Sequence, residues 1–122
     1  MNEQQFKDRT KRLALRVIRL AEALPQGRSA DVIGKQIVRS ATSVGANYRA
    51  ACRGRSDGTM IAKLDIVLEE ADETLFWLEL LAESGVFPET RLSDLMIETD
   101  EIVAMTVATL KTLRAKLRKG SK

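Results

Sequence analysis

The 122-residue sequence contains no histidine, and this absence removes several kinds of active site at once. Without histidine there is no Ser-His or Cys-His nucleophile pair, no imidazole general base and no His-containing metal site. The sequence also shows neither a nucleophile elbow nor a phosphate-binding glycine loop. We therefore expect a protein that is not an enzyme, has no catalytic residues and holds no metal ion or cofactor.

Cysteine and long apolar runs are equally scarce. The single cysteine, Cys52, cannot form an internal disulfide, which is typical of a chain kept in a reducing compartment. No apolar run approaches the roughly 20 residues that cross a bilayer. Residues 1–10 have no hydrophobic signal core. These features predict a cytoplasmic protein that has no membrane partner.

What the sequence has in abundance is helix-forming residues in amphipathic stripes. Hydrophobic residues make up 44% of the chain, which is enough for one globular core. Apolar residues recur at three- and four-residue steps near 3–24, 29–53, 59–85 and 88–117, with Ser29 expected to cap the second helix and Gly85 to end the third. The loops LPQGRS, GRSDG and VFPET separate these segments. They predict one all-α domain over residues 1–122, an up-down-up-down antiparallel four-helix bundle.

The segment RSATSVGANYRAACRGRS, residues 39–56, puts small and polar residues on a packing face of the second helix. We expect its hydroxyl and amide groups to bind carboxylates of the third helix, with Arg9 or Arg39 as a further partner, because a partly buried carboxylate needs hydrogen bonds. The alternative is that the small residues only thin the packing and that the carboxylates stay in water. The expected structural polar network comprises Ser40, Ser43, Asn47, Glu70, Glu73 and Thr74.

Charge is divided into blocks, with a net +8 over residues 1–56, −11 over 57–101 and +6 over 102–122. Antiparallel packing brings both basic blocks to one end, and four arginines of the first helix fall within about 80° of one another on a helical wheel. Arginine stripes suit phosphate oxygens, and aromatics make up only 4% of the chain, so we expect backbone-led binding of RNA or DNA. The candidate nucleic-acid-binding residues are Arg9, Arg12, Arg16, Arg19, Arg49, Arg53, Arg55, Lys111, Arg114 and Arg118.

The same basic surface would also fit an acidic protein, so an oligomeric protein-interaction adaptor is the alternative function. Leu15 lies among charged residues of the first helix, and Phe76 and Leu80 lie off the core stripe of the third. Apolar residues in such positions often mark an association surface. They predict that the chain associates with itself.

Three segments resemble a known family: FKDRTKRLALRVIRLAEALP, IVRSATSVGANYRAACRGRS and KLDIVLEEADETLFWLELL. They resemble the small four-helix-bundle proteins encoded within intervening sequences of bacterial 23S ribosomal RNA genes, a family similar to the accessory variability protein of diversity-generating retroelements. The resemblance implies a cytoplasmic, non-enzymatic homopentamer with a central channel, and the retroelement relative binds nucleic acid through basic surface. Ala50 departs from the pattern, which has an acidic residue after NYR. The matching motif residues are Arg9, Ser40, Ser43, Asn47, Glu70, Glu73 and Trp77.

Overall fold

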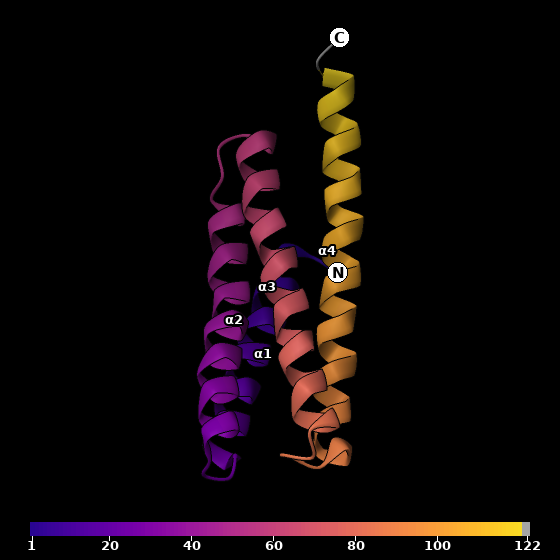
Figure 1. Cartoon of the computed structure of the whole chain (residues 1–122). Helices are drawn as coiled ribbons and strands as arrows, with labels where there is room; N and C mark the ends of the chain where they lie inside the picture. Colours follow the sequence, from indigo (N-terminus) through magenta and orange to yellow (C-terminus); the bar gives the residue numbers. More distant parts are fainter. Residues whose placement is uncertain (121–122) are drawn as a thin grey trace.

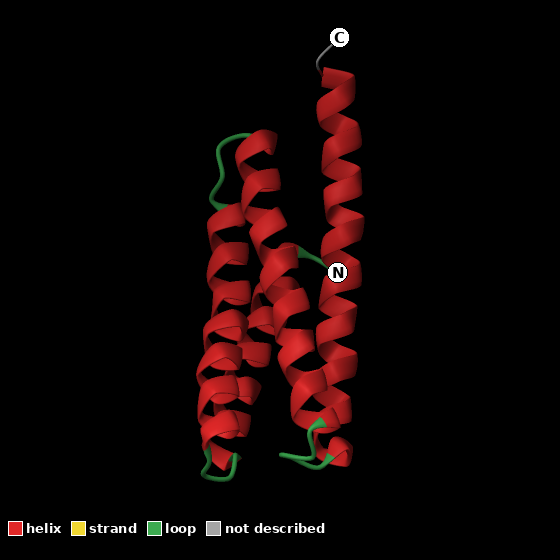
Figure 2. Ribbon diagram, viewed as in Figure 1, coloured by secondary structure: helices red, strands yellow, loops and turns green. Residues whose placement is uncertain are grey.

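The structure is a computed structural model that describes residues 1–120, and these residues form four helices joined by short loops (Figure 2). The helices are α1 (Glu3–Ala23), α2 (Arg28–Cys52), α3 (Asp57–Glu83) and α4 (Glu89–Gly120). Figure 1 shows α1 and α3 running in one direction and α2 and α4 in the other. The all-α class and the up-down-up-down order are therefore confirmed.

The ends of the helices follow local side-chain chemistry, with one difference from the predicted caps. The Asn2 and Ser56 side chains accept hydrogen bonds from the first turns of α1 and α3. Gly85 ends α3 as predicted, with a φ of 75° that a residue without a Cβ atom adopts at no steric cost. Ser29 does not cap α2. It lies inside that helix, whose N-cap is Gly27 and has no side-chain hydrogen bond.

The core consists of the stripes that the hydrophobic periodicity predicts. Each helix buries residues at three- and four-residue steps, so that four apolar faces meet along one axis. The packing is most extensive between α2 and α3, and it is slightest between α1 and α4. The largest fully buried apolar side chains are Leu13, Val17, Ile37, Val44, Val67, Leu78, Leu81, Leu92, Ile102 and Leu110.

Unequal helix lengths leave one end of the bundle incomplete. α4 has 32 residues, whereas α1 has only 21. In Figure 1, α1 begins beside the middle of α4, and α4 continues beyond the loop that joins α2 and α3. Leu117, which continues the predicted core stripe, is consequently 46% exposed. The basic end therefore consists mainly of the α2–α3 turn and the last turns of α4, and the start of α1 lies below them.

The small-residue face of α2 brings its neighbours close. A Cβ atom at Gly45 would lie 3.5 Å from the backbone oxygen of Thr10 in α1. Nearer the start of α2, the Ser40 hydroxyl accepts a hydrogen bond from Thr74 Oγ1 of α3 at 2.8 Å, and both residues are fully buried. The segment that looks too polar for a core thus sets the distance between helices on both sides of α2.

We predict that Gly45→Ala raises the free energy of unfolding and that Gly45→Leu lowers it. An added Cβ atom makes an ordinary contact with α1, and Ala is preferred over Gly inside a helix by up to about 1 kcal/mol. A leucine would push against the α1 backbone and should cost about 1–3 kcal/mol. Urea denaturation of both variants measures the effects, with Ala46→Leu on the exposed face as the control. A Gly45→Leu variant as stable as this control would show that α1 and α2 are not closely packed here.

Candidate nucleic-acid interface

The expected polar network is present only in part. Besides the bond between Thr74 and Ser40, Asn47 Nδ2 donates to Ser43 O and to Ser43 Oγ, each at 2.9 Å. The Ser40 hydroxyl also donates to the backbone oxygen of Ile37. Short polar side chains inside a helix commonly bond to carbonyls of the preceding turn. As a result, the hydroxyl and amide groups of α2 do not reach the carboxylates of α3.

Arg39 holds those carboxylates instead. Its Nη1 atom lies 2.8 Å from Glu70 Oε2, and its Nη2 atom forms an ion pair with Glu73. Trp77 Nε1 donates to Glu73 Oε2 at 3.3 Å. The expectation that serine and asparagine bind Glu70 and Glu73 is therefore wrong, and of the two cations considered it is Arg39 that pairs with them.

Arg9 crosses from α1 to α4 and is bound on several sides. Its Nε and Nη2 atoms donate to the two carboxylate oxygens of Glu98 at 2.6 and 2.7 Å, and Nη2 also donates to Glu101 at 2.7 Å. Only 17% of the side chain is exposed. The hydrogen bonds with Glu98 raise the pKa of the guanidinium above its ordinary value, although burial opposes this effect. Arg9 therefore links α1 to α4, the neighbouring helices with the least packing between them, and it is not a free cation in solvent.

Arg16 and Arg19 of the same stripe lie nearer the end of α1, away from the turn that joins α2 and α3. Arg16 and Arg19 line a groove of about 270 Å³ between α1 and α4, together with Arg91 and Asp94. Arg91 itself lies over the Phe87 ring, 4.5 Å from its centre. Arg12 is exposed on the same helix. The stripe that looks continuous on a helical wheel thus ends in a groove of mixed charge.

The basic stripe of α4 is partly neutralised by α3. Arg114 Nη2 binds both oxygens of Asp65 at 2.7 and 2.8 Å, and Lys116 Nζ lies 3.6 Å from Asp57. Lys111 and Arg118 are exposed on the same helix. Ion pairs at a surface are screened by water and salt, so these two pairs add little to the stability of the fold. They do reduce the net positive charge of this part of α4.

Four cations line a groove of about 280 Å³ between α1 and α2. Lys7 and Lys11 from α1 line it together with Arg49 in the last turn of α2 and Arg53 just beyond that helix. Within residues 1–120, no carboxylate forms an ion pair with Lys11, Arg49 or Arg53, while Lys7 pairs with Glu3 at 3.4 Å. We call these four cations the basic groove.

The candidate set derived from sequence contains only half of the basic groove. Arg49 and Arg53 belong to that set, and Arg55 follows them in the exposed turn. Lys7 and Lys11 do not belong to it. A sequence pattern that could have revealed all four is the spacing of four residues between Lys7 and Lys11 and between Arg49 and Arg53. This spacing places two cations one helical turn apart on each side of the groove.

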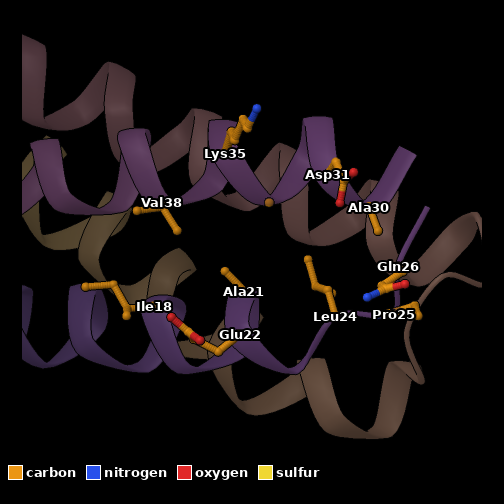
Figure 3. A pocket seen from close by; sticks show the side chains of 11 residues that line it. Ile18, Ala21, Glu22, Leu24, Pro25, Gln26, Ala30, Asp31, Lys35 and Val38 are labelled. Atoms are coloured by element: carbon orange, nitrogen blue, oxygen red, sulfur yellow. The ribbon is translucent and has the colours of Figure 1, made fainter. Parts of the chain in front are cut away.

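A larger groove, with a volume of about 680 Å³, lies at the opposite end of α1 and α2. Figure 3 shows Ile18 and Ala21 of α1 facing Val38 of α2 across it. Its charged lining residues are Glu22, Asp31 and Lys35. The grooves at the two ends of this helix pair therefore differ: four cations and one carboxylate line the first, whereas apolar side chains, two carboxylates and one lysine line the second.

Cys52 and Tyr48 carry the thiol and the phenol of α2, and neither group is activated as a nucleophile. Burial raises the pKa of the Cys52 thiol, and burial followed by a hydrogen bond with Cys52 raises the pKa of the Tyr48 hydroxyl. Both groups therefore stay protonated at neutral pH. In the part of the chain that the structure describes, no group of three or more histidine, cysteine or acidic side chains is placed to hold a metal ion. None of the helices described combines the length and the apolar character needed to span a membrane.

Comparisons with known proteins place the chain among small helical bundles. A sequence model of the family described as 23S rRNA-intervening sequence protein matches residues 2–108. The crystal structure of a protein of unknown function from the S23 ribosomal protein family of Bacteroides thetaiotaomicron VPI-5482 is similar, with a TM-score of 0.84 and 34% sequence identity. The match covers 91% of this chain and 99% of that one. No curated protein sequence is significantly similar to the chain.

We predict that Arg9→Met lowers the free energy of unfolding by about 2 kcal/mol, because hydrogen bonds to charged groups contribute about 1.5–3 kcal/mol. The substitution also leaves Glu98, which is 21% exposed, without its cation. Arg28→Met, at an exposed position in the first turn of α2, is the control and should change stability by less than about 0.5 kcal/mol. Urea denaturation distinguishes the two. Equal stability of the two variants would mean that the Arg9 contact does not hold α1 against α4.

We predict that Cys52 of the folded protein is alkylated more slowly near pH 8 than an ordinary cysteine. A raised pKa lowers the thiolate fraction at that pH, and the thiolate is the nucleophile. The rate measured against pH with iodoacetamide should therefore inflect above about 8.5, the unperturbed cysteine pKa. The chain unfolded in urea supplies the reference curve. Coincident inflections in the folded and unfolded chains would contradict the burial of this thiol.

Proposed function

This chain belongs to the 23S rRNA-intervening sequence protein family, and we propose that it is a non-enzymatic, cytoplasmic homo-oligomer that binds nucleic acid through the basic groove. The family resemblance implies a pentameric ring as its oligomeric state. One observation carries the proposal, namely the convergence of Lys7, Lys11, Arg49 and Arg53 on one groove in which Asp8 is the single acidic lining residue.

The chemistry of the basic groove suits a chain of phosphates. The cations on each side lie one helical turn apart, which is about 6 Å along the helix axis. Guanidinium groups bind phosphate oxygens in pairs, whereas the lysine ammonium groups act as compact charges. Aromatic side chains do not line the groove. Binding of this kind follows the backbone of a nucleic acid and depends little on its sequence.

The contact surface that we propose is smaller than the set of ten candidate residues. Arg9 and Arg114 are held by carboxylates of α4 and α3, respectively. Arg16 and Arg19 line a groove that also contains Asp94. Arg55, next to the basic groove in sequence, and Lys111 of α4 remain exposed cations that can add to the field around the groove.

We predict that the affinity for a structured RNA hairpin falls steeply with salt, because displaced counterions drive such binding. A site that neutralises four phosphates should lose about fifty- to hundred-and-fifty-fold in affinity when salt rises from about 50 to 200 mM. The Arg49→Gln/Arg53→Gln variant should bind more weakly at low salt and should reduce the salt slope by about 1.4–1.8. Fluorescence anisotropy on the hairpin, and on a DNA duplex of equal length, measures both effects.

The matched control for this titration is Arg28→Gln/Lys35→Gln. It removes the same charge from exposed positions at the other end of α2, so its affinity should stay close to that of the wild type. An equal loss in both variants would mean that only net charge matters and would overturn the basic groove as the site. If neither nucleic acid binds at low salt while a single acidic protein does, the adaptor function replaces the proposal.

A further inference from the structure

Two exposed apolar side chains lie on helices that do not touch each other. Leu15 of α1 is 45% exposed and Phe76 of α3 is 49% exposed. Each of these helices packs against α2 and α4, and no contact joins α1 to α3. They are therefore diagonal members of the bundle, so that their outer faces point away from each other in roughly opposite directions.

Phe76 is the centre of an acidic face. Residues three, four or seven positions away lie next to it on the surface of the helix. Four of these neighbours are carboxylates that no cation of the same chain pairs with, within residues 1–120. The phenyl ring packs edge-on against Trp77, with centroids 5.2 Å apart, so it has a fixed neighbour on its own helix. We call this the acidic face of α3, and its carboxylates are Glu69, Asp72, Glu79 and Glu83.

Leu15 is the centre of a face of the opposite charge. Arg12 and Arg19 lie three and four residues away on the surface of α1, and both are exposed without an ion-paired carboxylate in the described part of the chain. Ile18, three residues beyond Leu15, is 38% exposed and extends the apolar centre. We call this the basic face of α1. Both faces therefore have an apolar centre, but their charges differ. The charged neighbours of Phe76 are all acidic, whereas those of Leu15 are three cations, Lys11, Arg12 and Arg19, and two carboxylates seven residues away, Asp8 and Glu22.

We propose that these faces bind each other between copies of the chain, with the acidic face of α3 in one copy docked on the basic face of α1 in the next. The apolar centres meet, and the arginines bind the surrounding carboxylates. This inference rests on the self-association in the proposed function and specifies its interface. Because the two faces differ and point apart, the contact is heterologous and repeats from copy to copy, closing into a ring or continuing as a filament.

The proposal also assigns a role to two arginines that sequence patterns place with nucleic acid. Arg12 and Arg19 bind carboxylates of a neighbouring copy, while the basic groove stays on the side of α1 next to α2. A standard interface covers about 800 Å² of each partner. That is about a tenth of the 7475 Å² that the chain exposes, so both faces together still leave most of the surface free.

A mixing experiment tests the interface directly. The variant Arg12→Glu/Arg19→Glu loses the basic face but keeps the acidic one. The variant Phe76→Glu loses the apolar centre of the acidic face but keeps the basic one. Light scattering after gel filtration should give a multiple of 13.6 kDa for the wild type and a single 13.6 kDa chain for each variant alone. An equimolar mixture should form a one-to-one heterodimer, because only one intact pair of faces remains.

Matched controls separate this effect from charge and exposure. Arg28→Glu/Lys35→Glu makes the same charge change on α2, and Ile97→Glu places a carboxylate at an apolar position of α4 that is at least as exposed as Phe76. Both controls should keep the wild-type mass. Circular dichroism verifies that every variant retains its helices, so that a lower mass reports a lost contact between folded chains.

Three results would overturn the interface. If the wild type is oligomeric and both face variants keep its mass, the copies meet elsewhere. If each variant is monomeric and their mixture stays monomeric, the contact does not join the α1 face to the α3 face. If the wild type itself is a monomer at high concentration, both the interface and the proposed self-association are wrong. The titration with RNA then tests nucleic-acid binding independently.

Discussion

The pairing of Arg9 with Glu98 and Glu101 determines which cations of α1 are neutralised and which stay exposed. α1 and α4 share little packing, so this ion pair supplies the main polar contact across their seam. It directs the flank of α1 that carries Arg9 toward the acidic flank of α4. The opposite flank of α1, with Lys7 and Lys11, is then placed beside the end of α2. One partly buried contact thus separates a neutralised arginine from the cations that remain in solvent.

Hydrophobic periodicity was sufficient to predict the fold and nearly all of the core. It succeeds because each helix buries one stripe, and the spacing of that stripe is fixed by the helical turn. Leu117 continues the stripe but is exposed, since periodicity does not say where a neighbouring helix begins. The cap of α2 was missed for a similar reason, because Ser29 and Gly27 are both acceptable caps by residue type.

Prediction of the site was less complete because it depends on contacts between helices. A helical wheel shows that Arg9 and Arg16 share a flank but not which helix that flank meets. The pairing of Glu70 with Arg39 across α2 and α3 likewise follows from three-dimensional packing. Serine and asparagine side chains on α2 donate hydrogen bonds to backbone oxygens of their own helix. Residue type alone does not show whether such a side chain bonds to its own helix or to a neighbouring one. Association through the faces around Leu15 and Phe76, and binding at the basic groove, would use different surfaces of this one arrangement.

Nuclear magnetic resonance of the arginine Nε–H groups during titration with an RNA hairpin shows whether RNA binds at the basic groove or at Arg9. We expect the Arg49 and Arg53 signals to shift in proportion to bound RNA, while the Arg9 signal stays in place because Glu98 already accepts its Nε–H hydrogen bond. A shift of Arg9 together with unchanged signals of Arg49 and Arg53 would contradict the account. It would show that RNA displaces the carboxylates and binds at the seam between α1 and α4.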